Sequence, residues 1–234
     1  QAATRLGATF CEGTEVLSLK RAGNKVTGVN TPMGGVNSEQ VLIAAGPWSS
    51  MHTDWFGEEY SMQVPIRPVK GERILLRKPG FLPKTPVRNF EAYVVPQLDG
   101  DILVGATREE LRFDQVVTAN GVNRMINAAV LSYPGLAGAE FVSGRSGVRP
   151  ATPDGMPVLG PIEALEGLSI AAGHDSVGIM LSPATAELVT LYRRCRVFVF
   201  PSTAETFLSF ANAGSERFFG QHLHLVDILS GCRF

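Results

Sequence analysis

The feature that most constrains the fold of this chain is the segment 168–192. Its first residues, Leu168 to Ala172, form a short apolar run that is typical of a buried strand, and they lead through Gly173 into a helix expected to begin at about Val177. Glycine at such a connection lets a ligand approach the backbone, and the amino end of the helix favours negative charge. The segment therefore predicts a strand, turn and helix that meet an anionic cofactor edge. Tight packing alone is the alternative, because it is the commoner reason for glycine at such a turn.

A rigidly held cation is expected just upstream, where Arg149 precedes Pro150. A residue before proline is held in extended backbone, and the stretch 152–155 has the composition of a tight turn, so Arg149 is predicted to end a strand. Its guanidinium is always charged, and its planar donors match a carboxylate. Arg149 is thus a candidate carboxylate anchor, and an ordinary structural ion pair is the equally weighted alternative.

The rest of the chain predicts an α/β fold with two kinds of sheet. Residues 36–44 predict one strand that enters a buried sheet, followed by a turn and a short helix at Gly46. From 65 to 107 the pattern changes to short strands and turns, which is typical of an antiparallel sheet. A helix is predicted over 118–132, and Tyr133-Pro134-Gly135 would end it. Further strands are expected at 8–11, 15–21, 25–30, 73–77, 92–95, 102–104 and 140–148, with the end of a helix at 1–7 and a hairpin turn at Met33-Gly34-Gly35.

Composition indicates a globular protein and excludes several partners. Hydrophobic residues make up 44% of the 234, and the formal net charge is −1, so neither a basic footprint for nucleic acid nor a long apolar run for a membrane is present. The cysteines Cys11, Cys195 and Cys232 are far apart and show no metal or redox spacing. We therefore expect no disulfide framework and no metal, and a cytoplasmic location in the absence of a signal peptide.

A series of ordered motifs resembles the FAD-dependent D-amino-acid oxidase, glycine oxidase and sarcosine oxidase superfamily, and the glycine oxidase branch most closely. The motifs are VLIAAGPWS at 41–49, PIRPVKGE at 65–72, YVVP at 93–96, GAT at 105–107, GVRPATPDGMPVLG at 147–160 and AGHDSVGI at 172–179. The resemblance covers roughly residues 1–192. It implies an α/β (α+β) protein with part of an FAD/NAD(P)-binding domain at 1–50 and 140–192, and an antiparallel substrate-binding (cap) domain at 51–139.

Both ends of the chain depart from the family pattern. The family begins with a GxGxxG loop for the FAD pyrophosphate, and the chain has no such fingerprint and begins with Gln1. We therefore expect it to be part of a longer protein. The tail 193–234 does not match the family; an out-of-frame or spliced end would explain it, and an extra helix at about 204–213 is the alternative.

The resemblance assigns roles to particular residues. Arg149 falls where the family binds the substrate carboxylate, and Tyr93 falls where a tyrosine hydroxyl assists it; an ordinary half-buried strand residue is the alternative for Tyr93. The implied cofactor-binding residues are Gly46, Trp48, Gly147, Gly173, His174, Gly178 and Ile179. Two of these have plain alternatives, because His174 also suits a turn and Trp48 also suits a core. The helix start near Gly178 would stabilise negative charge on a reduced flavin.

Two departures from the relatives bear on substrate and cofactor. Glycine oxidase relatives often carry an arginine where this chain has Ser176, so strict glycine specificity is not expected. Sarcosine oxidase relatives attach flavin through a cysteine near the motif that contains Arg149, and residues 147–151 contain none. FAD is therefore expected to bind noncovalently.

The implied activity is oxidation of an amino acid or amine. A hydride would pass from the α-carbon to the flavin, the imine would hydrolyse, and O2 would be reduced to H2O2, while the protein orients the reactants. Two alternatives stay open: a dehydrogenase subunit of the same fold that passes electrons to a partner or quinone, and a truncated, non-catalytic remnant. A homo-oligomer is compatible with all three.

Overall fold

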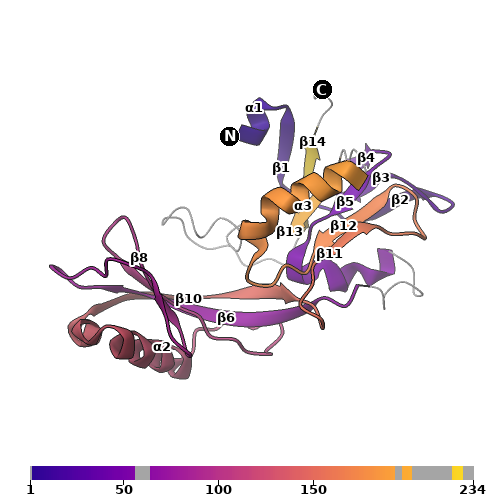
Figure 1. Ribbon diagram of the computed structural model, residues 1–234. Coiled ribbons are helices and arrows are strands. Elements are labelled where there is room, and N and C mark those ends of the chain that lie inside the picture. Colours follow the sequence, from indigo (N-terminus) through magenta and orange to yellow (C-terminus); the bar gives the residue numbers. More distant parts are fainter. Residues whose placement is uncertain (1, 56–63, 193–196, 202–222, 229–234) are drawn as a thin grey trace. The chain divides into compact units, whose positions relative to one another are not determined.

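The computed structural model describes residues 2–55, 64–192, 197–201 and 223–228, and the chain forms two compact units (Figure 1). Unit 1 consists of Gln1–Arg67 and Pro150–Phe234, and unit 2 of Pro68–Arg149. The predicted α/β class is confirmed: unit 1 contains a mixed sheet and helices, and unit 2 contains a sheet with antiparallel pairs and one long helix. The domain borders expected from the sequence, at 50/51 and 139/140, stay a prediction.

The large sheet of unit 1 has six strands in the order β1-β14-β13-β5-β12-β11. Their bounds are Ala8–Glu15 (β1), Leu223–Ile228 (β14), Val197–Pro201 (β13), Val41–Ile43 (β5), Leu168–Ala172 (β12) and Val158–Pro161 (β11). Strand β5 runs parallel to both of its neighbours, β12 and β13. All three residues of β5 are buried, as expected for a parallel strand covered on both faces.

Unit 1 also contains a three-stranded antiparallel sheet, with β3 (Lys25–Thr31) between β2 (Ser18–Ala22) and β4 (Gly34–Asn37). The predicted hairpin is present, but its turn lies at residues 32–33 and the two glycines already belong to β4. The single strand predicted over 36–44 is wrong, because β4 and β5 belong to different sheets. Between them the Ser38 hydroxyl donates to the Gln40 carbonyl oxygen (2.7 Å) and accepts from the Gln40 N–H (3.3 Å), a local bond that competes with strand pairing.

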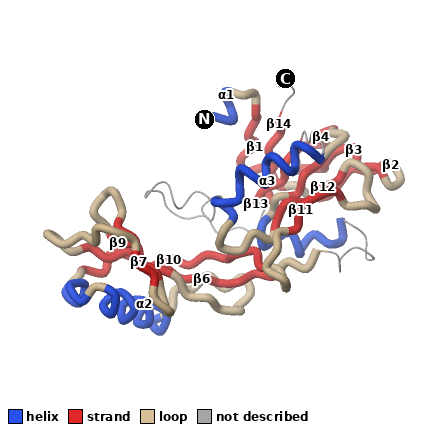
Figure 2. The backbone as a smooth tube through the Cα atoms, viewed as in Figure 1, coloured by secondary structure: helices blue, strands red, loops and turns tan. Residues whose placement is uncertain are grey.

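Among the described residues of unit 1, the helical elements are α1 (Ala2–Arg5), the 3₁₀ segment η1 (Gly46–Trp55) and α3 (Gly178–Tyr192). Helix α1 lies within the helix end predicted at 1–7, η1 begins at the predicted turn at Gly46, and α3 comes after the predicted glycine turn that follows β12. Figure 2 shows α3 running beside the strands of the large sheet, and its residues contact β11. The helix considered for 204–213 lies outside the described residues.

The sheet of unit 2 has the strand order β10-β6-β9-β8-β7. The bounds are Glu140–Ala151 (β10), Arg67–Arg77 (β6), Ile102–Gly105 (β9), Tyr93–Pro96 (β8) and Val87–Arg88 (β7). Strands β6, β9, β8 and β7 pair antiparallel in succession, which confirms the predicted antiparallel sheet.

Helix α2 (Ala119–Ser132) covers one face of this sheet and encloses the core of unit 2 (Figure 2). The buried core side chains are Ile74, Leu76, Ala92, Val94, Ile102, Val104, Met125, Ala128, Ala129 and Leu136. Each such large aliphatic side chain contributes about 1.5–3 kcal/mol on burial. The helix begins at the cap residue Thr118, whose hydroxyl accepts from the Gly121 N–H at 3.0 Å, and it ends before Tyr133 and the 3₁₀ segment η3 (Pro134–Gly138), as predicted.

Candidate functional site

The first group of predicted residues lies at one edge of the large sheet of unit 1. Strands β5 and β12 are parallel neighbours, with Ile43 paired to Ile170, so the connections that follow them leave the same edge. Gly46 and Trp48 lie on the connection after β5, and Gly173, His174, Gly178 and Ile179 on the one after β12. In open parallel sheets ligands bind outside the carboxyl ends of the strands. The fold therefore brings six of the seven predicted cofactor-binding residues to the edge where a cofactor is expected.

The turn after β12 is tightly packed. Gly173 has φ +82°, and a Cβ there would lie 2.7 Å from the Cγ2 atom of Thr152. Asp175, two residues further along the turn, also has positive φ (49°), and its N–H donates to the Pro150 carbonyl oxygen at 2.8 Å. Both interactions fix the turn against the segment that begins at Pro150. The positive φ and the close approach of Thr152 both favour glycine at position 173, and its role in cofactor binding stays a prediction.

His174 ties this turn to helix α3. Its side chain is half-buried, and its Nε2 atom lies 2.9 Å from the Thr185 hydroxyl oxygen. Burial lowers the pKa of the imidazole, which favours the neutral ring at pH 7. A neutral imidazole adds no positive charge at this edge, so the positive end of the α3 dipole is the feature of this turn that attracts an anion.

The two connections differ in their surroundings. Gly46 has φ +53°, and a Cβ built on it would meet no atom within 4 Å. Trp48 is only 6% exposed, so its ring belongs to the core of unit 1. At the start of α3, by contrast, the Ile179 side chain is 51% exposed. The edge thus combines open backbone at Gly46 with the exposed first turn of a 15-residue helix.

The second group of predicted residues lies on unit 2, on the face of its sheet opposite α2. Side chains alternate along β6, and Ile74 and Leu76 belong to the core beneath α2, so Gly71 and Arg73 face the other way. In register, Arg73 pairs with Gly105 on β9, and Gly105 pairs with Tyr93 on β8. We refer to the surface formed by Gly71, Arg73, Gly105, Tyr93 and Arg149 as the open face.

Arg149 lies flat on this open face. Its Nη1 atom donates to the carbonyl oxygens of Thr107 (3.1 Å) and Lys70 (3.5 Å), and a Cβ on Gly71 would lie only 2.2–2.4 Å from three of its guanidinium atoms. The side chain is half-buried and comes from β10, two residues before the last residue of that strand, Ala151. Backbone acceptors and a missing Cβ therefore fix the direction of this guanidinium.

Tyr93 is placed in the same manner. A Cβ on Gly105 would lie 2.6 Å from the Tyr93 hydroxyl oxygen and 2.7 Å from the ring carbon that carries it. The ring therefore extends over β9, toward β6 and the position of Arg73. The remaining predicted residue, Gly147, is a half-buried residue of β10 in unit 2.

The sequence reasoning did not identify three features of this sheet: Gly71, Gly105 and the ion pair of Lys70 with Glu72. The two glycines become informative only when the strand register shows which side chain lies over each. Lys70 Nζ lies 3.0 Å from Glu72 Oε1, and both side chains are 0% exposed. Charged residues at alternate positions of a strand that is otherwise apolar on that face were the available signal for the pair.

The ion pair is embedded in further polar contacts beneath the open face. Glu72 Oε1 accepts from both the N–H and the hydroxyl of Thr118 at 3.1 Å, and Asp114 Oδ2 lies 3.4 Å from Lys70 Nζ. Burial alone lowers the pKa of Lys70, but hydrogen bonds and charge from Glu72 and Asp114 outweigh it and raise that pKa. Thr107 joins the two faces: its hydroxyl accepts from the Glu72 N–H at 2.9 Å, and its carbonyl oxygen accepts from Arg149.

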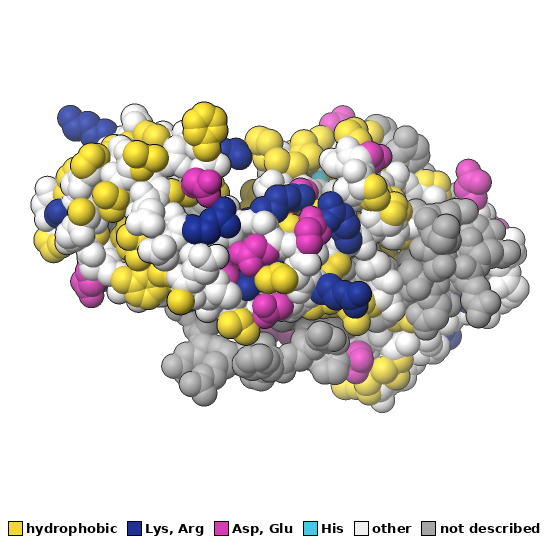
Figure 3. Space-filling view, turned by 90° about the horizontal axis from the view of Figure 1, so that it is seen from below, with side chains coloured by type: hydrophobic (Ala, Val, Ile, Leu, Met, Phe, Trp, Pro, Cys, Tyr) yellow, Lys and Arg dark blue, Asp and Glu magenta, His cyan; other side chains and the backbone are white. Residues whose placement is uncertain are grey.

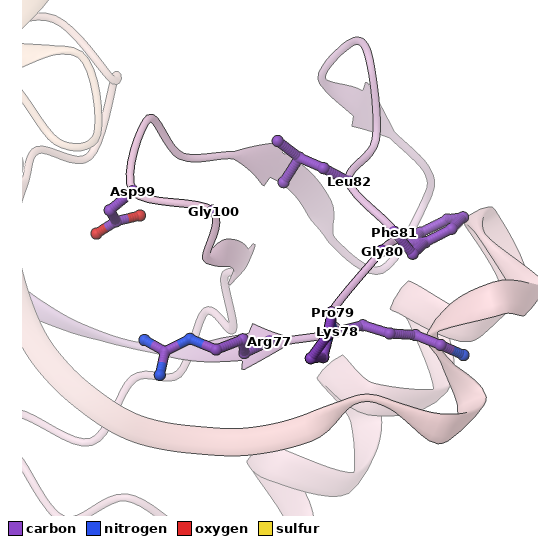
Figure 4. Close-up of a pocket in the computed structure, with 8 residues that line it drawn as sticks. All are labelled: Arg77, Lys78, Pro79, Gly80, Phe81, Leu82, Asp99 and Gly100. Carbon is purple, nitrogen blue, oxygen red and sulfur yellow. The ribbon is translucent and has the colours of Figure 1, made fainter.

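A separate hollow of about 440 Å³ lies at the other end of β6 (Figure 4). Its lining residues are Arg77, Lys78, Pro79, Gly80, Phe81, Leu82, Asp99 and Gly100. The Arg77 Nε atom pairs with Asp101 Oδ1 at 2.6 Å, and the Lys78 side chain extends away toward helix α2 and bonds the Gly135 carbonyl oxygen. None of the sequence-predicted residues lines this hollow, so it does not belong to the candidate site.

On the face drawn in Figure 3, basic and acidic side chains of the described residues are interspersed rather than gathered into an area of one sign. Within the ranges described above, no group of three or more His, Cys, Asp or Glu side chains is placed to hold a metal ion. In the same part of the chain, no helix combines the length and apolar character needed to cross a membrane.

Comparison with known proteins identifies similar chains. The family model described as FAD dependent oxidoreductase (DAO) matches residues 1–191. Glycine oxidase of Pseudomonas putida is 34% identical over 180 residues, which are 76% of this chain and 48% of that protein. The crystal structure of glycine oxidase from Geobacillus kaustophilus has a TM-score of 0.69 and 36% identity, over 76% of this chain and 47% of that one. The crystal structure of L-proline dehydrogenase from P. horikoshii has a TM-score of 0.68 and 25% identity, over 75% and 48%. The chain spans about half the length of the curated relatives it matches.

Proposed function

Because this chain belongs to the family of FAD dependent oxidoreductases, we propose that it forms part of a flavoenzyme that oxidises a small amino acid or amine. The family supplies the cofactor, FAD, and resemblance to glycine oxidases supports a substrate with a carbon–nitrogen bond next to a carboxylate. The proposal concerns the whole protein to which this sequence contributes.

The observation that carries the proposal is the placement of Arg149. A carboxylate is bound best by a guanidinium that is already oriented, because less side-chain entropy is then lost on binding. Arg149 has this property, since two carbonyl oxygens and the bare backbone of Gly71 hold it. We assign it the substrate carboxylate, with Tyr93 as a hydroxyl donor to the same group.

The residues at the edge of unit 1 fit a flavin. Gly46 offers backbone with no atom where a Cβ would stand, and the first turn of α3 presents N–H groups where negative charge is stabilised. Gly173, His174, Gly178 and Ile179 would line the same edge, and Trp48 would support it from the core. FAD bound there supplies the acceptor for a hydride, while the chain binds and orients the substrate. Binding is proposed to be noncovalent, because residues 147–151 contain no cysteine.

The electron acceptor distinguishes two versions of this function. We propose O2, with H2O2 as product, in line with the resemblance to oxidases. A dehydrogenase that passes electrons to a partner or quinone is the second candidate, favoured by the similarity to L-proline dehydrogenase. Composition and cysteine usage support a cytoplasmic location as part of the proposal.

The experiment begins with the visible absorption spectrum of the 234-residue chain after incubation with FAD and desalting. Retained flavin bands would show that the residues present suffice to hold FAD. A colourless chain would agree with the missing GxGxxG loop, and the kinetic test would then use the longer protein to which this sequence contributes. In the flavin-loaded protein, Arg149→Met is expected to lower kcat/KM for glycine and sarcosine by at least about 100-fold while flavin stays bound.

The matched control is Arg124→Met, which removes an equal charge from the exposed side of α2, where Arg124 pairs with Glu91. It should leave kcat/KM within about twofold. Full activity of Arg149→Met would refute the assignment of the carboxylate site, and rapid dye reduction with slow peroxide release would select the dehydrogenase version.

A further inference from the structure

The segment that follows β9 contains one more residue than the part of β6 with which it pairs. Arg73 pairs with Gly105 in the regular part of the ladder, and Lys70 pairs with Glu109 in an isolated antiparallel bridge. Between these two pairs lie two residues of β6 but three residues, 106–108, of the other segment. An extra residue of this kind is a β-bulge, and bulges change the direction of backbone and side-chain groups beside binding sites.

Thr107, in the middle of this bulge, bonds to Glu72 with its side chain where a regular ladder uses the main chain. Its N–H donates to the Glu72 carbonyl oxygen at 3.1 Å, but the Glu72 N–H donates back to the Thr107 hydroxyl oxygen at 2.9 Å. In a regular antiparallel pair this second bond goes to a carbonyl oxygen. The hydroxyl of Thr107, a residue that is only 4% exposed, thus takes the place of the Thr107 carbonyl oxygen in the ladder.

The Thr107 carbonyl oxygen accepts from Arg149 Nη1 instead, at 3.1 Å. Arg149 belongs to β10, the neighbour of β6 on the side away from β9, so its side chain crosses β6 over the bare backbone of Gly71 to reach this oxygen. The second acceptor, the Lys70 carbonyl oxygen, is farther away at 3.5 Å and also accepts the Glu109 N–H at 3.0 Å. Thr107 therefore provides the shorter of the two bonds.

We propose that Thr107 is a positioning residue for the substrate carboxylate, because its hydroxyl keeps its own carbonyl oxygen available to Arg149. This inference rests on the proposed function, in which Arg149 binds that carboxylate. Without the hydroxyl, the Glu72 N–H has to turn to the Thr107 carbonyl oxygen or stay unpaired, and an unpaired buried donor is costly. Either outcome weakens or moves the bond that directs the guanidinium.

The test is steady-state kinetics with glycine and sarcosine, on the flavin-loaded chain or on the longer protein to which it contributes. Thr107→Val keeps the shape of the side chain and removes the hydroxyl. KM should rise about 3- to 10-fold, the range of one hydrogen bond, while kcat changes by less than about twofold. Acetate has a carboxylate and no amine, so its inhibition constant should rise by the same factor. Thr107→Ser keeps the hydroxyl and should stay within about twofold of the unaltered protein.

The double variant Thr107→Val, Arg149→Met shows whether Thr107 acts through the guanidinium. If it does, the hydroxyl has nothing left to orient in Arg149→Met, and the added change should alter kcat/KM by less than about twofold. A full additional 3- to 10-fold loss would overturn the inference, because Thr107 would then act independently of Arg149. An unchanged KM in Thr107→Val would overturn it as well, and Thr107→Ala is the second hydroxyl-free variant if circular dichroism shows that Thr107→Val does not fold.

Thr31→Val is the matched control, in unit 1. Thr31 is also buried, at 8% exposed, and its hydroxyl likewise accepts a backbone N–H, that of Met33 at 3.2 Å. This variant should lose stability without a rise in KM. A rise in KM here would assign the effect of Thr107→Val to a general loss of stability and contradict the inference.

Arg149→Met separates this inference from the function on which it rests. A large loss of kcat/KM in Arg149→Met, together with an unchanged KM in Thr107→Val, would leave the proposed function standing and remove the role of Thr107. An unchanged kcat/KM in Arg149→Met would remove both.

Discussion

On the same strand, β6, charged side chains on the two faces have opposite surroundings. Toward α2, Lys70 and Glu72 are completely buried and neutralise each other at 3.0 Å. On the open face, Arg73 and Arg149 are half-buried, and Arg145 adds a further positive charge on the neighbouring strand. Opposite charges are thus matched within the core, and positive charges lie near one another on the open face, which is the arrangement expected if the first face carries structure and the second binds an anion.

Glycines differ in the same way between the two faces. On the α2 side, a Cβ on Gly121 would fall on the Glu72 carboxylate, so this glycine allows helix and ion pair to approach each other. On the open face, Gly71 and Gly105 lie beneath Arg149 and Tyr93. A substitution on the first face should therefore affect stability, and one on the second should affect ligand binding.

The largest expected effect comes from breaking the buried pair. Lys70→Met leaves the Glu72 carboxylate buried without its cation and should lower the free energy of unfolding by about 3–5 kcal/mol. Urea unfolding followed by circular dichroism measures this loss. Lys84→Met, at an exposed position of the same unit, should change stability by less than about 0.5 kcal/mol.

The double variant Lys70→Met, Glu72→Leu sharpens the result, because it removes both charges and should recover much of the lost stability.

The dependence of the free energy of unfolding on pH has a defined sign. The folded-state pKa of Lys70 is raised above 10.5, so its contribution is complete below pH 10.5 and is lost as the pH rises through the folded-state value. Lys70→Met should lack this alkaline loss, and an unchanged alkaline profile would contradict the role of the pair.

The second effect belongs to the open face. Gly71→Ala places a methyl group within 2.2–2.4 Å of the Arg149 guanidinium, which must then move. In the flavin-loaded protein we expect KM for the amino acid to rise by about 10- to 100-fold, with kcat less affected, because the carboxylate anchor is displaced. Gly138→Ala is the control, since a Cβ there meets only the Lys78 Nζ atom at 3.4 Å. Unchanged KM in Gly71→Ala would mean that the direction of Arg149 does not matter for binding.

A smaller effect is expected at Gly105. Gly105→Ala displaces the Tyr93 ring, whose hydroxyl oxygen would lie 2.6 Å from the new methyl group. If Tyr93 only assists the carboxylate, KM should rise by about tenfold or less, the net value of one hydrogen bond. Tyr93→Phe should show the same rise, because it removes the hydroxyl and keeps the ring. Agreement between the two variants would assign the effect to the hydroxyl, and a much larger effect of Gly105→Ala would assign it to the backbone of β9.

Local patterns in the sequence predicted the helices and strands of this fold better than they predicted which strands pair and which residues share a face of a sheet. Helix α2 was predictable because its apolar spacing and its Tyr133-Pro134-Gly135 stop are encoded within a few residues. The β12–α3 unit was predictable because an apolar run leads through Gly173 into a helix. The break between β4 and β5 was not, because a side-chain bond of Ser38 interrupts an otherwise continuous strand pattern.

The candidate site divides in the same way. Arg149 was a candidate from its place before Pro150 as well as from a family resemblance, and Tyr93 from the resemblance alone. The places of Gly71 and Gly105 beneath these side chains depend instead on which residue of one strand lies opposite which residue of the next. Register joins residues far apart in the chain, and no local pattern specifies it here. The close approach of Thr152 to Gly173 likewise joins two distant segments.

The smallest effect tests whether the two faces are independent. Thr118→Ala removes the cap of α2 and one of the two Thr118 donors to Glu72 Oε1, since the hydroxyl accepts from the Gly121 N–H and donates to the carboxylate, whereas the Thr118 N–H stays. The expected cost is about 1–2 kcal/mol, and Thr118→Ser, which keeps both bonds, should cost less than half of that. Asn123→Ala, a change at an exposed residue of the same helix, should leave the free energy of unfolding nearly unchanged.

Because Thr107 connects Glu72 to Arg149 through its hydroxyl and carbonyl oxygen, an accompanying change in KM would show that the ion pair helps to orient the carboxylate anchor. A loss of stability with unchanged KM would show instead that β6 separates its structural face from its binding face.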